Sequence, residues 1–339
     1  MKWYKRSLAL LTAVSAGYFI GRHYKRKNEK SVSGPRYLIV NADDFGMSDG
    51  VTEGIVRAWR DGVVTSTSAL INLDGAPERI ARAHAEYPDM PIGLHLNVTL
   101  GKPVLPPEKV PSLVDAAGNF YDRFRIFEHI YDISLDELRA ELFAQAELLR
   151  STGVNFDHID YHQHLMVTHT PFYPLVCEMA RQFAVPVRQP VPESFYGQIK
   201  VRGKSSGANT QTALKFVTQY PALILRLVPG FLPSTYHQKA MWLDDAGIKT
   251  TNWLVMSLYD KPSVENFVLV LKQLPPGISE MVVHPAIVDD GLRRLGGSYI
   301  NRRADELAML TDPRVRDALA ESRVTLVDFS FVQQGLEIG

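Results

Sequence analysis

The sequence predicts a single α/β domain with a distorted (β/α) barrel-like fold, preceded by a short hydrophobic N-terminal extension. Residues 1–34 are expected to form this extension and its linker, and residues 35–339 the domain. Apolar runs alternate with amphipathic segments, a pattern typical of parallel α/β folds. About seven or eight such units over ~300 residues suit a complete or irregular barrel, with a doubly wound open sheet as the alternative. The composition, 45% hydrophobic and 22% charged, is that of a globular protein.

The strands are predicted from continuous apolar or β-branched runs, which are typical of strands buried in a parallel sheet. The predicted strands are residues 37–42, 63–72, 92–98, 156–160, 280–284 and 324–329.

The helices are predicted from apolar residues at helical spacing and from their capping residues. Ser134–Glu137 matches a capping box, so a helix is expected from there to just before Gly153. The other predicted helices are residues 49–61, 77–87, 171–183, 264–274 and 302–310. Residues 190–250 show no clear pattern, and we expect inserted loops or a substrate lid there.

The N-terminal segment contains an uncharged, mostly apolar run at residues 7–20, with basic residues on both sides. Fourteen residues are short for a membrane span, which needs about 20. A membrane anchor is favoured, and a cleaved signal peptide or an organelle presequence stays open. The denser basic cluster after the run predicts membrane association with a cytoplasmic catalytic domain, whereas cleavage of a signal would predict export.

Charge and cysteine content exclude several classes of protein. Residues 1–30 carry eight basic residues and one acid, whereas the rest carries 29 basic and 36 acidic residues. The domain is therefore a poor candidate for binding nucleic acid. The single cysteine, Cys177, excludes an internal disulfide and a multi-cysteine metal cluster. The sequence leaves open a homodimer.

Acidic residues and histidines occur at the ends of the predicted strands, where parallel α/β proteins build their sites. Asp43 and Asp44 follow the strand 37–42, and two adjacent carboxylates there point in different directions. His95 lies inside the strand 92–98. His284 ends the strand 280–284.

Three histidines and an acid occur together between residues 158 and 164. If the strand continues, side chains alternate and His158, Asp160, His162 and His164 lie on one side. Ionised carboxylates and neutral imidazoles are metal ligands, so these strand ends together predict a mononuclear divalent-metal site. His169 follows closely after.

The motifs that are absent narrow the chemistry. We find no Walker loop, no G-x-G-x-x-G after the first strand and no G-x-S-x-G elbow. A mixed Asp/His site favours metal-assisted hydrolysis, in which a carboxylate takes a proton from water and a histidine protonates the leaving group.

Five separated motifs carry a resemblance to a known family: NADDFG (41–46), GVVTSTSALIN (62–72), GLHLN (93–97), HIDYHQH (158–164) and VHPAIVDD (283–290). In order and spacing they resemble the YdjC-like carbohydrate deacetylases, including the members associated with hopanoid biosynthesis. The resemblance implies a distorted barrel and removal of acetyl groups from N-acetylated amino sugars.

Carried over motif by motif, the resemblance implies that Asp44, His95 and His162 hold the metal, that Asp43 is the general base and that His284 is the general acid. Mg²⁺ is the cofactor it favours, although two imidazoles also suit Zn²⁺. Further candidates for a supporting or substrate-binding role are Asn41, Asn97, His158, Asp160, His164, His169 and Asp289.

The chain also departs from the family pattern. Ala286 stands where a glycine usually follows the His-Pro pair, and the apolar N-terminal run is an addition. That run makes a membrane-linked glycolipid a candidate substrate beside an oligosaccharide. The alternatives are a metal-dependent phosphoesterase or amidohydrolase on a related barrel, and a non-catalytic carbohydrate-binding protein.

Overall fold

The structure, a computed structural model, describes residues 34–335 apart from residues 198, 204–217, 219–229, 231 and 298. Its strands form one sheet in which every pair is parallel. The order is β4-β3-β2-β1-β6-β5, and β7 pairs with β1. The strands are β1 (Arg36–Phe45), β2 (Ser66–Ala69), β3 (Ile92–Leu96), β4 (Ile159–Tyr161), β5 (Trp253–Val255), β6 (Gly277–Val283) and β7 (Val324–Leu326).

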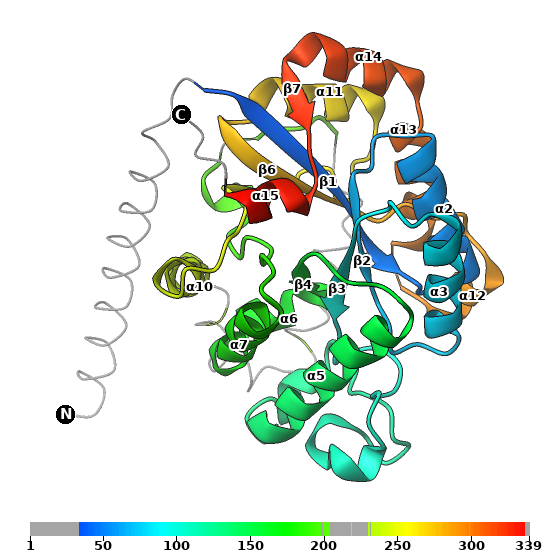
Figure 1. Cartoon of the computed structure of the whole chain (residues 1–339), viewed down its shortest axis with the longest axis vertical. Helices are drawn as coiled ribbons and strands as arrows, with labels where there is room; N and C mark the ends of the chain where they lie inside the picture. The colour runs from blue at the N-terminus through cyan, green and yellow to red at the C-terminus, as the bar shows by residue number, and fades with distance from the viewer. Residues whose placement is uncertain are drawn as a thin grey trace.

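The sheet curls into a barrel-like form, as predicted (Figure 1). Residues 187–192 lie between its two edge strands: Val187 makes a parallel bridge to Ile159 of β4, and Pro192 makes one to Leu254 of β5. Because all strands run parallel, their carboxyl ends meet at one end of the barrel, where the side chains of a site can converge.

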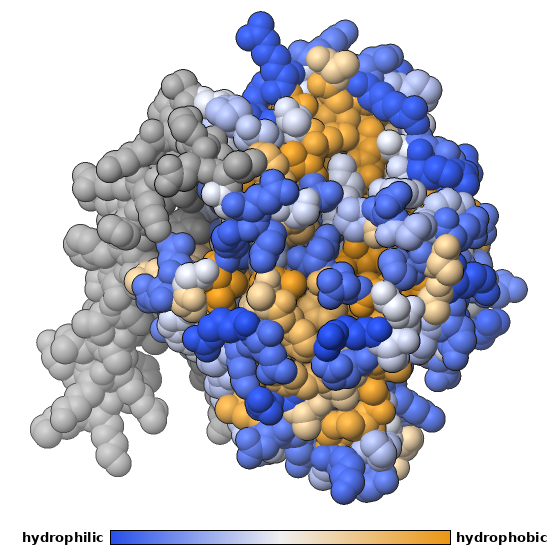
Figure 2. Space-filling model, viewed as in Figure 1, coloured by the Kyte–Doolittle hydropathy of each residue, from blue (hydrophilic) through white to orange (hydrophobic). Residues whose placement is uncertain are grey.

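Helices surround the sheet (Figure 1). Their apolar sides face the strands, and the face drawn in Figure 2 shows mainly polar residues with apolar ones in the hollows between them. The longer helices are α2 (Asp49–Arg60), α3 (Ala76–Glu86), α5 (Leu135–Ser151), α7 (Tyr173–Phe183), α10 (Pro233–Asp245), α11 (Val264–Gln273), α13 (Ile300–Leu310) and α14 (Pro313–Ser322). The shorter ones are α4 (Ile126–His129), α6 (Leu165–Thr168), α12 (Asp290–Leu295) and α15 (Phe329–Gln334).

A small apolar cluster separates one part of the interior from the main core. Phe329 and Val332 of α15 pack against Ile39 of β1 and Ile278 of β6. Side chains alternate along a strand, so Asn41 and Glu280, two residues further on, point to the same side as these two isoleucines. The interior therefore changes from apolar near α15 to polar toward the carboxyl ends of the strands.

Several predicted bounds were wrong. The predicted strand 324–329 ends at Leu326, because Asp328 caps α15 by accepting a hydrogen bond from the backbone N–H of Ser330. The predicted strand 63–72 is paired only over β2. At the predicted capping box, Ser134 accepts from the Glu137 N–H, but the Glu137 carboxylate accepts from the Ser112 N–H instead of closing the box.

The predictions for residues 1–30 lie outside the described residues, as does much of the predicted loop or lid at 190–250. Within 190–250, the structure places α10 at Pro233–Asp245. Among the described residues, no helix has the length and apolar character needed to cross a membrane.

Candidate active site

An irregularity at the end of β1 separates the two adjacent acids. The pairing with β2 shifts register between Ala42 and Phe45, and Asp44 has a φ of 75°. A residue other than glycine in this left-handed region is strained, and such strain gathers at functional sites. As a result Asp44 turns toward His95 and His162, whereas Asp43 turns toward Arg188 and His284.

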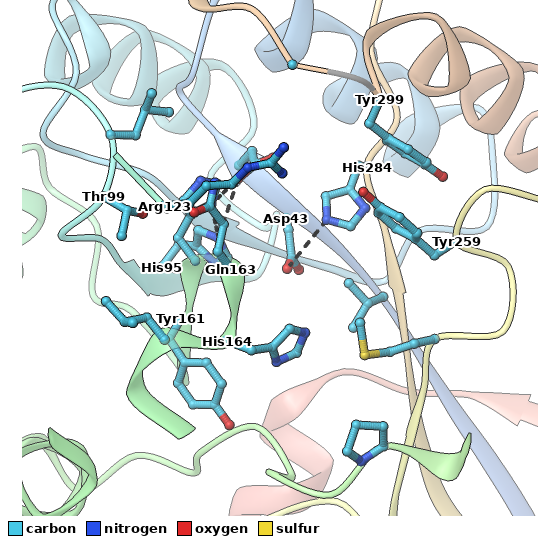
Figure 3. Close-up of a pocket in the computed structure, with 18 of the residues that line it drawn as sticks. Asp43, His95, Thr99, Arg123, Tyr161, Gln163, His164, Tyr259, His284 and Tyr299 are labelled. Atoms are coloured by element: carbon cyan, nitrogen blue, oxygen red, sulfur yellow. Dashed lines mark hydrogen bonds and ion pairs between the residues drawn. The ribbon is translucent and has the colours of Figure 1, made fainter. Parts of the chain in front are cut away.

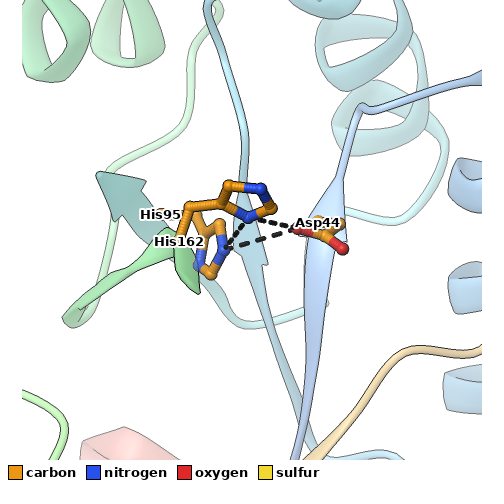
Figure 4. Close-up of side chains that lie close together, drawn as sticks. All are labelled: Asp44, His95 and His162. Atoms are coloured by element: carbon orange, nitrogen blue, oxygen red, sulfur yellow. Dashed lines mark hydrogen bonds and ion pairs between the residues drawn. The ribbon is translucent and has the colours of Figure 1, made fainter. Parts of the chain in front are cut away.

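The side chains of Asp44, His95 and His162 meet at one point (Figure 4). Asp44 Oδ1 lies 3.4 Å from His95 Nε2 and 3.1 Å from His162 Nδ1, and the two nitrogens are 3.2 Å apart. Three ligands held about 2.0–2.1 Å from one ion lie roughly 3.0–3.4 Å from each other. The three predicted ligand residues therefore have the spacing that a divalent cation requires.

One further contact and one unpartnered oxygen suit this group to a metal. Asp160 Oδ1 lies 2.7 Å from His95 Nδ1, which fixes the ring proton there and leaves Nε2 as a ligand atom. Asp44 Oδ1 is buried and has no hydrogen-bond partner among the described residues. An unpartnered buried carboxylate oxygen beside two imidazoles fits a cation.

Arg303 stabilises the negative charge of Asp44 by binding its second carboxylate oxygen. Arg303 Nη2 donates to Asp44 Oδ2 at 2.5 Å. Burial opposes ionisation of Asp44, but Arg303 and the two imidazoles outweigh it and hold its pKa well below the ordinary value. Asp44 is therefore ionised at neutral pH, as a metal ligand must be.

A second group of possible ligands, Asp43, His95 and Asp160, already has a cation beside it. Arg188 is fully buried, and its two terminal nitrogens each lie 2.7 Å from an oxygen of Asp43. Nη2 also lies 2.7 Å from Asp160, and Nε donates to Glu280 at 2.6 Å. Arg188 binds both oxygens of Asp43, whereas Arg303 leaves Asp44 Oδ1 without a hydrogen-bond partner, so the group around Asp44 is the better metal site.

The sequence analysis missed both arginines. Arg188 follows the short apolar run 185–187 and donates its backbone N–H to Ile159 of β4, so it occupies a strand-end position like the predicted acids. That position was the available signal. Arg303 lies on α13, and we find no signal in the sequence that links it to Asp44.

His284 stands on the other side of Asp43, with Nε2 4.0 Å from Asp43 Oδ2 (Figure 3). Its ring lies edge-on to Tyr259 and Tyr299, and its backbone N–H donates to Glu306. Burial lowers the pKa of His284 to about 4, so the imidazole is neutral at pH 7.

The predicted alternation over residues 158–164 holds only to Tyr161. There the strand ends, and Gln163 and His164 take left-handed φ angles of 54° and 55°. This turn brings His162 to the metal site and places His164 in the pocket wall (Figure 3). His158 lies deeper, with its ring stacked 3.7 Å from the ring of Phe329.

Of the remaining predicted site residues, one contacts the site and the others make structural contacts elsewhere. Asn41 donates to Asp43 Oδ1 at 2.9 Å and so belongs to the site. Asn97 instead holds the loop after β3, through bonds to Asn72 and Leu100. Asp289 caps α12 and also accepts from the Gly50 N–H. His169 packs against Tyr131 and Phe172.

These side chains line a pocket of about 1600 Å³ at the carboxyl end of the barrel. Asp43, Asp44, His95, His162 and His284 all contribute to its wall. The volume exceeds what a single sugar unit needs, since pockets for drug-sized ligands are ~300–1,000 Å³. The arrangement can hold a divalent cation, a base and a proton donor around one bound group.

Comparisons with known proteins show which family the chain is similar to. A sequence model of the YdjC-like protein family matches residues 37–321. A carbohydrate deacetylase of Thermoanaerobacter pseudethanolicus is 30% identical over 88% of this chain and 100% of its own length. A chitooligosaccharide deacetylase of Proteus mirabilis is 32% identical over 84% and 94%. A crystal structure from Enterococcus faecalis, described as a cellobiose-phosphate cleavage protein, superposes with a TM-score of 0.69 at 29% identity and covers 88% of this chain and 98% of its own.

Proposed function

The chain belongs to the YdjC-like family and is a hydrolase that deacetylates sugars. We propose that its substrates are N-acetylated amino sugars and that it removes their acetyl group with a divalent metal bound by Asp44, His95 and His162. The observation that carries the proposal is the 3.1–3.4 Å spacing of the three ligand atoms, with Asp43 and His284 on the adjoining wall. A cation bound there would polarise the acetyl carbonyl and lower the pKa of water.

Asp43 is the proposed general base. Burial opposes its ionisation, but Arg188 outweighs burial and lowers the pKa of Asp43, so the carboxylate is ready to accept a proton from the attacking water. The two bonds from Arg188 and one from Asn41 hold this carboxylate in one orientation. Asp43 therefore contributes orientation as well as basicity.

His284 is the proposed general acid. Water adds to the acetyl carbon, the carbon–nitrogen bond breaks, and the amine nitrogen gains a proton from the imidazole. His284 Nε2 is 4.0 Å from Asp43 Oδ2, so the proton that Asp43 takes from water has a short path to the imidazole. Acetate and a free amino sugar are the products, and the protons balance without another reactant.

The experiment is acetate release from N,N′-diacetylchitobiose by the full chain, after treatment with EDTA and after addition of single divalent metals. We expect activity to disappear with EDTA and to return with Mg²⁺ or, as the alternative, with Zn²⁺. Asp43→Asn should lose at least about a hundredfold in kcat yet bind metal, whereas Asp44→Asn should lose both.

Asp49→Asn is the matched control, because Asp49 is an exposed acid in the first turn of α2, outside the pocket wall. Equal rates for the wild type and Asp43→Asn would exclude the mechanism.

The proposal extends to the kind of molecule that carries the N-acetylated sugar. We propose an oligosaccharide or a glycolipid, the latter because residues 7–20 are suited to a membrane anchor with the catalytic domain in the cytoplasm. Fractionation of cells that express the full chain tests this part. Recovery of the protein entirely without membranes would contradict the anchor and the glycolipid and leave the oligosaccharide as the substrate.

A further inference from the structure

Tyr259 lies in the pocket wall beside His284, and the proposed metal site and proton transfers leave it without a role (Figure 3). It follows β5 and therefore belongs to the same end of the barrel as the site. Its ring stacks on Tyr299 with centroids 4.2 Å apart and an angle of 8°, which covers one face. Tyr259 nonetheless stays partly exposed.

The ring that Tyr259 stacks on and the backbone of His284 are held by the same residue, Glu306. The Tyr299 hydroxyl donates to Glu306 and accepts the backbone N–H of Asp260 at 3.2 Å. Glu306 also accepts the backbone N–H of His284. One buried carboxylate thus connects the proposed acid to the ring on which Tyr259 rests.

The backbone next to Tyr259 is strained. Asp260 is buried and has a φ of 67°, in the left-handed region. The turn is closed by two bonds, from the Tyr259 N–H to Met256 and from the Lys261 N–H to Leu258. Strain of this kind persists where the surrounding structure enforces it, and it gathers at binding and catalytic sites.

We propose that Tyr259 is the surface on which the acylated sugar ring packs, and so is a specificity-determining residue. The inference rests on the proposed function. The departing nitrogen is bonded directly to a sugar ring carbon, so the ring must lie next to the group that protonates this nitrogen. The Tyr259 ring centroid is 5.8 Å from that of His284, and an aromatic ring is a rigid apolar surface for the C–H side of a sugar.

The test measures binding separately from catalysis. Calorimetric titration of the full chain in EDTA with N,N′-diacetylchitobiose gives the Kd, and acetate release with added metal gives KM and kcat. Tyr259→Leu should weaken binding roughly tenfold, and Tyr259→Phe should stay within about twofold. Tyr121→Leu is the matched control, since Tyr121 also stacks on a neighbouring ring, that of His129, but does not line the pocket.

The outcomes separate this inference from the proposed function. A Kd for Tyr259→Leu equal to that of the wild type or of Tyr121→Leu would overturn it. So would an equal loss in Tyr259→Phe, because the hydroxyl rather than the ring would then matter, and so would a wild type that does not bind the sugar. If the expected Kd pattern appears while no metal supports acetate release, the inference stands and the proposed function fails.

Discussion

Arg188 and Asp43 are joined by two hydrogen bonds of 2.7 Å inside the barrel, where neither side chain has appreciable contact with solvent. The same guanidinium contacts Asp160 and Glu280. The proposed base and the carboxylate that orients His95, a proposed metal ligand, thus depend on one cation. Arg188 therefore links the proposed general base to the proposed metal site.

The first prediction concerns that cation. Arg188→Met leaves two or three buried carboxyl groups facing each other without a counter-charge, and we expect a loss of about 3–5 kcal/mol in the free energy of unfolding. Urea denaturation followed by circular dichroism measures it. Arg139→Met is the control, because the Arg139–Glu178 pair is largely exposed and should contribute little. A variant at position 188 as stable as this control would refute the expectation.

The second prediction concerns the orientation of His95. Asp160→Asn keeps a similar shape but weakens the contact to His95 Nδ1, so metal affinity should fall about 10–100-fold. Calorimetric titration with Zn²⁺ or Mn²⁺ measures the change. Asp157→Asn is the matched control, since Asp157 contacts His158 instead. Equal metal affinity in the two variants would mean that Asp160 does not affect metal binding by His95.

The third prediction concerns Glu306, whose pKa burial raises from 4.5 to about 7. The folded state then holds this proton more tightly than the unfolded state, so the contribution of Glu306 is complete below about pH 4.5 and is lost as the pH rises through 7. The difference in unfolding free energy between the wild type and Glu306→Gln should fall across that window by up to about 1.4 kcal/mol per pH unit. Urea denaturation at several pH values measures this difference, and a constant difference would contradict the assignment.

The fourth prediction concerns the contact between Gly93 of β3 and His158, the residue just before β4. A Cβ added to Gly93 would lie 2.2 Å from His158 Cε1, and the imidazole is held against Phe329. Gly93→Ala should therefore cost about 1–3 kcal/mol. In the background of His158→Ala, which removes the ring, the same change should cost much less. Thermal or urea unfolding of the four proteins gives the coupling, and strict additivity would show that the ring is not the obstacle.

The sequence predicted those features that depend on position along a strand. Asp44, His95 and His162 each lie at or just beyond a strand end, and parallel strands bring such positions together. The barrel-like fold followed from the same alternation of elements. Alternation and strand-end positions were sufficient to predict the fold and a shared site, whereas the resemblance to the YdjC-like family singled out these three residues as the ligands.

Other features depend on contacts that no local pattern announces. Arg188 and Asp43 are 145 residues apart in the chain, and Arg303 and Asp44 are 259 apart. The turn after Tyr161 depends on two left-handed residues, Gln163 and His164, that a pattern of alternating polar residues hides. Such backbone conformations are set by tertiary packing and not by local preference.

The position of α15 has a consequence for the timing of biosynthesis. Phe329 and Val332 come after all the strands in the chain, yet they cover Ile39 and Ile278 on the side of the interior away from the pocket. Until α15 docks, water can reach the ionic cluster around Arg188 from that side and weaken its attractions. The ionic cluster is thus shielded from water on that side only after this last helix has been translated and has docked.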